Sequence, residues 1–161
     1  EKILDEISPI NTEVSKELVA ESPKHDPHGR PVLVADDSSV ARKQVIRCLE
    51  TVGVEVVALN DGREAYEYLR KMVEEGKQPE REFLMLISDI EMPVMDGLNL
   101  TLRIKEDSML KKLPVLLFSS LITEKLRHKG VSVGADDQIS KPEVTQLAHR
   151  AMALIKAREQ A

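Results

Sequence analysis

The stretch that decides the fold is VLVADDS, residues 32–38. Its first four residues form a continuous apolar run, which is typical of a strand buried on both faces of a parallel sheet. Asp37, Ser38 and Ser39 then offer side-chain oxygens that can cap a helix. Apolar residues follow at helical spacing, and Gly53 ends the pattern. The positions in question are Val40, Ala41, Val45, Cys48, Leu49 and Val52.

The alternation of strand and helix continues along the chain. Four more strands are predicted, at residues 54–59, 83–87, 114–118 and 137–140. Helices are predicted around Ala65 to Val73, at 97–106, near 122–129 and from Val144 to Ile155, with a charged loop at 74–82. Five strands that alternate with helices indicate an α/β fold, a doubly wound parallel sheet covered on both faces.

The segment 97–106 has the wrong period for a helix. Leu98, Leu100, Leu102 and Ile104 alternate as they would in a strand. We nevertheless predict a helix, because two parallel strands need a crossover connection between them.

Five polar residues follow or end the predicted strands. Asp36 and Asp37 follow the first strand, and Asp89, Ser119 and Lys141 end the third, fourth and fifth. In parallel α/β sheets the ligand site lies beyond the carboxyl ends of the strands. The five side chains are therefore expected at one edge of the sheet.

Three carboxylates at one edge repel each other, by roughly 4 kcal/mol for a pair 4 Å apart at an effective dielectric of 20. Mg²⁺ is the counter-ion that carboxylate and carbonyl oxygens favour, and Lys141 supplies a second positive charge. An aspartate can attack phosphorus and form an acyl phosphate. We therefore expect Asp89 to be the nucleophile and Asp36 and Asp37 to hold the metal. Ser119 and Lys141 would stabilise the charge of the phosphoryl group.

At these residues the chain resembles the response-regulator receiver family. The matching segments are VLVADDS (32–38), LISDIEMPVMDG (86–97), PVLLFSS (114–120) and ISKPE (139–143), within residues 31–158. The resemblance implies a CheY-like, flavodoxin-like fold with strand order 2-1-3-4-5. It also implies phosphorylation of Asp89 by a histidine kinase, slow self-hydrolysis, and metal held by Asp36, Asp37, Asp89 and the Glu91 backbone carbonyl. The Lys141–Pro142 bond is expected to be cis.

The chain departs from the family pattern at several positions. Gln138 stands where the family usually has an aromatic switch residue, so the usual coupling of hydroxyl movement to ring burial is in doubt. Ser119 replaces the commoner threonine, Ser120 replaces a small apolar residue, and the connection 74–82 is long.

Residues 1–30 are expected to be a tail and linker. EKILDEISP, residues 1–9, is similar to the end of a CheW-like coupling domain. A CheW-like domain joined to a receiver is the layout of CheV-type chemotaxis coupling proteins. This second resemblance implies a CheA-like kinase as phosphodonor and contact with chemoreceptors through the upstream domain.

Other functions remain open at this point. A standalone response regulator fits the same motifs, and a receiver-like domain used only for protein contacts is a third possibility. A phosphatase with an aspartyl nucleophile needs a second aspartate two positions later, but Glu91 follows Asp89 there. We therefore expect a regulatory phosphoacceptor and not an enzyme.

The composition limits the partners and the cellular compartment that we expect for this chain. A formal net charge of −5 argues against a nucleic-acid surface, which needs a basic patch. The single cysteine, Cys48, is expected on a buried helix face in a reduced, cytoplasmic compartment. No apolar run is long enough to insert into a membrane.

Overall fold

Five parallel strands lie at the centre of the molecule. The computed structural model describes residues 29–120, 123–140 and 146–160. The strands are β1 (Val32–Ala35), β2 (Val56–Leu59), β3 (Leu86–Asp89), β4 (Val115–Ser119) and β5 (Asp137–Ser140). They form one sheet in the order β2-β1-β3-β4-β5, so the predicted α/β fold and its strand order are confirmed.

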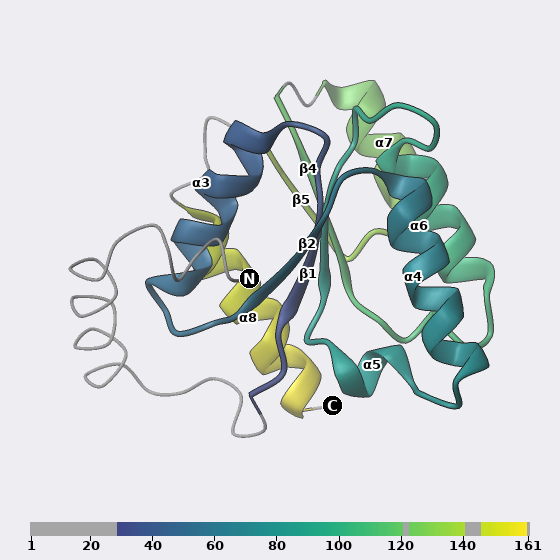
Figure 1. Cartoon of the computed structure of the whole chain (residues 1–161). Helices are drawn as coiled ribbons and strands as arrows, with labels where there is room; N and C mark the ends of the chain where they lie inside the picture. Colours follow the sequence, from purple (N-terminus) through teal and green to yellow (C-terminus); the bar gives the residue numbers. More distant parts are fainter. Residues whose placement is uncertain (1–28, 121–122, 141–145, 161) are drawn as a thin grey trace.

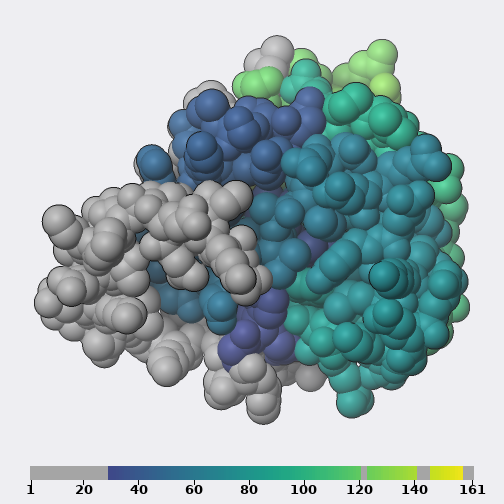
Figure 2. Space-filling view, in the orientation of Figure 1, coloured from purple at the N-terminus to yellow at the C-terminus, as the bar shows by residue number. Residues whose placement is uncertain are grey.

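Helices cover both faces of the sheet (Figure 1). On one face lie α3 (Ser39–Glu50) and α8 (Leu147–Gln160). On the other lie α4 (Gly62–Glu74), the short α5 (Pro79–Glu82), α6 (Gly97–Glu106) and α7 (Glu124–Ser132). In the same orientation, Figure 2 shows the blue atoms of α3 and the blue-green atoms of β2 and α4 as one continuous surface. None of the described helices is long and apolar enough to cross a membrane.

Successive residues of β1 point to opposite faces, which explains why this strand is apolar without a break. Val32 and Val34 pack against the layer of α3 and α8. Leu33 and Ala35 pack against the layer of α4 and α6. All four residues of β1 are buried. Each strand position therefore contributes to one of two separate cores.

The loops that enter four of the helices end on a capping side chain. In each case a side-chain oxygen accepts a hydrogen bond from a backbone N–H three residues later, which satisfies one of the free donors of the first turn. The pairs are Ser38 with Ala41 (3.2 Å), Asp61 with Glu64 (2.9 Å), Asp96 with Asn99 (2.7 Å) and Thr123 with Leu126 (3.1 Å). These caps fix where each loop at the carboxyl edge of the sheet ends.

The prediction of a helix at 97–106 is confirmed as α6. Its buried residues are Gly97, Leu100, Thr101 and Ile104, at positions i, i+3, i+4 and i+7 of one helix face. Leu102 is exposed, and Leu98 only packs against the edge of the core. The alternating pattern was therefore misleading, because two of its four leucine and isoleucine positions do not belong to the buried face.

Two predicted boundaries and one loop were wrong. The third strand runs from Leu86 to Asp89 and not over 83–87, because Asp89 still pairs with Phe118 of β4. The second strand begins at Val56 and not at residue 54. The loop predicted at 74–82 contains α5, which starts at Pro79, a residue suited to the first position of a helix.

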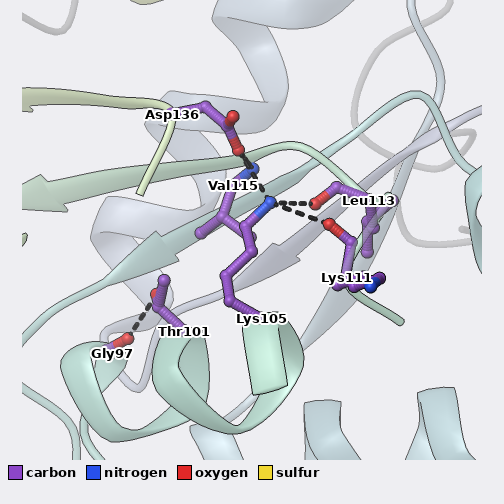
Figure 3. A network of polar contacts seen from close by, with 7 residues as sticks. All are labelled: Gly97, Thr101, Lys105, Lys111, Leu113, Val115 and Asp136. Atoms are coloured by element: carbon purple, nitrogen blue, oxygen red, sulfur yellow. Dashed lines mark hydrogen bonds and ion pairs between the residues drawn. The ribbon is translucent and has the colours of Figure 1, made fainter. Parts of the chain in front are cut away.

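A polar network fastens the amino end of β4, away from the carboxyl edge (Figure 3). Lys105, near the end of α6, points its Nζ at the carbonyls of Leu113 (2.8 Å) and Lys111 (3.2 Å) and at Asp136 Oδ2 (3.0 Å). The same Asp136 oxygen accepts a hydrogen bond from the Val115 backbone N–H at 2.8 Å. One ammonium group thus ties α6 to the starts of β4 and β5.

Replacing this ammonium group should cost stability. The variant Lys105→Met keeps most of the side-chain length but removes three charge-assisted hydrogen bonds from a mostly buried position, so we expect the free energy of unfolding to fall by about 2 kcal/mol. Urea unfolding measures this. Lys111→Met is the matched control, because only the Lys111 backbone carbonyl takes part. Equal stability of the two variants would contradict the role of Lys105.

Candidate functional site

Three carboxylates meet at the carboxyl edge of the sheet. Asp36 and Asp37 directly follow β1, and Asp89 is the last residue of β3. One carboxylate oxygen from each residue lies within 4.8 Å of the others. Asp36 is 1% exposed and Asp89 2% exposed, whereas Asp37 faces solvent. The structure therefore brings together the three carboxylates that the sequence placed at this edge.

The chain after β1 turns in a way that holds Asp36 in place. The Ser38 backbone N–H donates a hydrogen bond to Asp36 Oδ1 at 2.9 Å. One turn into α3, the Arg42 guanidinium donates to the Asp36 backbone carbonyl at 2.6 Å. Both the side chain and the main chain of Asp36 are thus bonded to the start of α3, so the buried carboxylate has little freedom to move.

Two close approaches of the backbone confine the loop that follows Asp89. A Cβ atom on Gly97 would lie 2.1 Å from the Asp89 backbone oxygen, and one on Gly62 would lie 2.3 Å from the Met95 oxygen. Only glycine fits at such distances. The Gly97 N–H also donates to the Ile90 carbonyl at 2.8 Å. The starts of α4 and α6 therefore hold this loop from two sides.

One residue of this loop adopts a strained backbone conformation. Val94 has a φ of 70°, in the left-handed region, and its side chain is 75% exposed. A β-branched residue there costs about 1–2 kcal/mol relative to the usual right-handed conformation. The contacts at Gly62 and Gly97 must hold the loop firmly enough to impose that cost.

Ser119 is the last residue of β4, and its side chain faces the loop after Asp89. Its Oγ donates a hydrogen bond to Glu91 Oε1 at 3.2 Å, and the Ser120 Oγ donates to the same oxygen at 3.0 Å. The Glu91 backbone N–H lies 3.4 Å from Asp89 Oδ1. Glu91 is thus in contact with both the buried aspartate and the buried hydroxyl of the site.

Lys141 lies outside the described residues, and so does the Lys141–Pro142 bond that was predicted to be cis. The structure does place the end of β5 next to the site, because Ser140 pairs with Ser119. The next residue of the chain is Lys141.

Gln138 is buried in β5, with 5% of its surface exposed. Its Nε2 donates to the Arg127 carbonyl of α7 at 2.9 Å. A Cβ atom on Gly130 of α7 would lie only 2.4 Å from the carboxamide carbon and Oε1. Gly130 is the only residue of α7 classed as buried. The carboxamide therefore occupies a notch in α7 and supplies one of the few contacts that hold this helix to the sheet.

The acidic cluster has the chemistry of a site for a hard divalent cation. Carboxylate pairs at 4.8 Å repel each other by roughly 3–4 kcal/mol at an effective dielectric of 20. Oxygen donors of this kind suit Mg²⁺ better than softer metals. Imidazole and thiolate ligands are not part of the cluster.

Comparison with known proteins identifies the family. Residues 32–152 match the family model for the response regulator receiver domain. The chain belongs to this family, the receiver domains of two-component signalling. The resemblance inferred from four short segments of the sequence is thereby confirmed at the level of the family.

Relatives of the chain include receivers attached to kinases and receivers that stand alone. It is 32% identical to the sensor histidine kinase CheAY of Helicobacter pylori over 74% of its own length, but it spans only 14% of that relative. A receiver domain of a histidine kinase from Syntrophus aciditrophicus superposes with a TM-score of 0.68 at 28% identity, covering 80% of this chain and 91% of that one. The chemotaxis protein CheY4 of Vibrio cholerae gives a TM-score of 0.62 at 29% identity, with coverages of 76% and 98%.

Two side-chain contacts at and near the site were not predicted from the sequence. Glu91 was named only for its backbone carbonyl, whereas its side chain accepts two hydrogen bonds. Gln138 was recognised as unusual, but nothing in the pattern linked it to Gly130 or to the Arg127 carbonyl. Gly130 gave no signal, because it lies just beyond the helix predicted near 122–129 and only the observed α7, which runs to Ser132, places it inside a helix.

The notch in α7 can be tested with Gly130→Ala. The added methyl group would displace the Gln138 carboxamide and break its hydrogen bond to the Arg127 carbonyl, so we expect the free energy of unfolding to fall by about 1 kcal/mol despite the better helix propensity of alanine. Urea unfolding measures the change. In the background of Gln138→Ala, which removes the carboxamide, the same substitution should be neutral or stabilising. Destabilisation of equal size in both backgrounds would contradict the notch.

Proposed function

We propose that this chain is a phospho-accepting receiver that takes a phosphoryl group from a histidine kinase onto Asp89. The observation that carries the proposal is the cluster of Asp36, Asp37 and Asp89 at the carboxyl edge of a receiver fold, in which Asp36 and Asp89 are buried. Family membership supports it, because receiver domains are regulatory phosphoacceptors. Asp89 is the member of the cluster that ends a central strand, with the Ser119 strand as its neighbour.

The proposed transfer needs one nucleophile and several groups that bind charge. An oxygen of the Asp89 carboxylate forms a bond to phosphorus, and the bond from phosphorus to the donor's leaving group breaks. The leaving group takes the electron pair and is a nitrogen when the donor is a phosphohistidine. The Ser119 hydroxyl donates a hydrogen bond to one phosphoryl oxygen. Lys141, which directly follows β5, pairs with the negative charge of another.

We assign the metal site to the carboxylates of Asp36, Asp37 and Asp89 together with the backbone carbonyl of Glu91. When bound there, Mg²⁺ neutralises the repulsion among the carboxylates and the charge of the phosphoryl group. Asp36 is held by the Ser38 N–H, so its position does not depend on the metal. Asp37 is exposed, so its carboxylate would hold the ion from the solvent side of the site.

The proposed role is regulatory and not enzymatic, apart from slow hydrolysis of the acyl phosphate. A phosphatase with an aspartyl nucleophile would need a general acid close to Asp89. The nearest acidic side chain after it, Glu91, instead accepts hydrogen bonds from Ser119 and Ser120. This arrangement favours a phosphoacceptor over an enzyme that turns over many substrates.

We further propose a place in chemotaxis, as the receiver of a CheV-type coupling protein. The resemblance of residues 1–9 to a CheW-like domain supports this, as does the similarity to a chemotaxis protein from Vibrio cholerae. A CheA-like kinase would then be the donor, and chemoreceptors would be reached through the upstream domain in the cytoplasm. The sequence encoded upstream of Glu1 decides between this layout and a standalone response regulator.

Phosphorylation can be measured directly. Incubation with acetyl phosphate and Mg²⁺ should add one phosphoryl group, seen as a mass increase of about 80 Da, because Asp89 is a nucleophile in a site built for that charge. Asp89→Asn should abolish the increase, while Asp107→Asn, a change of the same type in the loop before β4, should keep it. An unlabelled wild-type protein under these conditions would overturn the proposal.

Mg²⁺ binding can be followed without phosphorylation. Because a ligand that binds only the folded state stabilises it by RT ln(1 + [L]/Kd), saturating Mg²⁺ should raise the free energy of unfolding by about 2–3 kcal/mol at a hundredfold excess over Kd. Asp37→Asn should weaken the apparent affinity at least about tenfold, since it removes one charged ligand. Glu74→Gln removes an exposed carboxylate at the last residue of α4 and serves as control. Equal Mg²⁺ responses of all three proteins would place the metal elsewhere.

A further inference from the structure

One carboxylate oxygen accepts hydrogen bonds from both serine hydroxyls at the end of β4. Glu91 Oε1 accepts hydrogen bonds from Ser119 Oγ at 3.2 Å and from Ser120 Oγ at 3.0 Å. The two serines belong to the end of β4 and the residue after it, and Glu91 comes two residues after β3. The carboxylate therefore bridges the ends of two neighbouring strands.

A serine hydroxyl carries only one proton and can donate only one hydrogen bond at a time. While Ser119 donates to Glu91, it cannot donate to a phosphoryl oxygen on Asp89. A carboxylate is also a strong acceptor, because hydrogen bonds to charged groups are about twice as strong as neutral ones. Glu91 and a phosphoryl group thus compete for the same proton.

We infer that Glu91 is a positioning residue that locks the resting site by holding the Ser119 and Ser120 hydroxyls. The inference rests on the proposed phosphorylation of Asp89 and extends it to the control of that reaction. Before the phosphoryl group can be bound by Ser119, the Glu91 side chain must release that hydroxyl. The side chain of Glu91 then slows phosphorylation, in contrast to its backbone carbonyl, which we assign to the metal.

The negative charge of Glu91 is expected to slow phosphorylation, as its hydrogen bonds to the two serines do. The Glu91 backbone N–H lies 3.4 Å from Asp89 Oδ1, so its side chain starts beside the acceptor residue. A transferring phosphoryl group is anionic, and a carboxylate within a few ångströms of it raises the energy of the transition state. Both effects predict that removal of the Glu91 charge speeds the reaction.

The backbone of the loop after Asp89 cannot easily move to release the serine hydroxyls from Glu91. Gly97 and Gly62 meet the backbone oxygens of Asp89 and Met95 at distances that leave no room for a methyl group. Release of the hydroxyls is therefore a rotation of the Glu91 side chain, which is exposed to solvent, and not a displacement of the loop.

The variant Glu91→Gln tests the lock because it keeps the shape and an acceptor oxygen but removes the charge. With acetyl phosphate at saturating Mg²⁺, the rate of mass labelling should rise about tenfold, which corresponds to ~1.4 kcal/mol for a charged hydrogen bond made neutral. Glu74→Gln makes the same charge change at the far end of α4, about 18 Å along the helix from Gly62, and should leave the rate unchanged.

A double-mutant cycle separates the lock from a general effect of charge. In a Ser119→Ala/Ser120→Ala background there is no hydroxyl to hold, so the gain from Glu91→Gln should shrink to about threefold or less, the share left for repulsion alone. An undiminished gain in that background would overturn the lock, and so would a rate in Glu91→Gln that equals or falls below wild type. If the wild-type protein is not labelled at all, the proposed phosphorylation itself has failed, which is a distinct result.

Discussion

Repulsion among three carboxylates is the constraint on which the rest of this structure depends. Asp36, Asp37 and Asp89 present oxygens within 4.8 Å of one another, and two of these residues are almost fully buried. The positions of the carboxylates are fixed by the fold around them and by hydrogen bonds such as the one from the Ser38 N–H to Asp36 Oδ1. The parallel pairing of β1 with β3 fixes the strand ends, and two apolar cores fix the strands. Stability made elsewhere in the fold thus offsets the local cost at the site.

The two ends of the sheet are built in different ways. At the amino end of β4, the Lys105 ammonium group ties three segments together with direct hydrogen bonds. At the carboxyl end, the contacts between strands include two serine hydroxyls that share one carboxylate oxygen. The first arrangement is fully paired without any ligand. The second consists of groups that can change partners, which is what a site that binds and releases an anionic group requires.

Much of this could be predicted from the sequence, for a physical reason. A buried parallel strand must be apolar along its whole length, so polar residues mark its end, and this rule located Asp36, Asp89 and Ser119. The local pattern of apolar residues was less reliable where buried residues lie outside a strand. The apolar residues 83–85 were taken for strand, although β3 begins at Leu86. The need for a crossover between two parallel strands predicted α6 correctly, whereas the alternating spacing of its apolar residues did not.

Contacts between side chains of different loops could not be predicted in this way. The carboxylate of Glu91 reaches Ser119 and Ser120 across 28 and 29 residues of sequence, and the fit of Gln138 into the notch at Gly130 depends on where α7 lies. Neither contact leaves a periodic trace in the sequence, because each joins single residues from two different segments. Gly130 itself lies just beyond the helix predicted near 122–129, so its place inside α7 was not evident from the sequence either.

Because the backbone of the loop after Asp89 is held in place, the rate at which this site rearranges is set by its side chains. Where a loop must move to open a site, opening typically takes nanoseconds to microseconds or longer, whereas an exposed side chain changes rotamer in picoseconds to nanoseconds. Gly62 and Gly97 hold the backbone of this loop, and Val94 keeps its unfavourable φ of 70° as a result. Any rearrangement at Glu91 therefore belongs to the fast class. The Ser119 and Ser120 hydroxyls can therefore be released and bound again many times while the backbone of the loop stays in place.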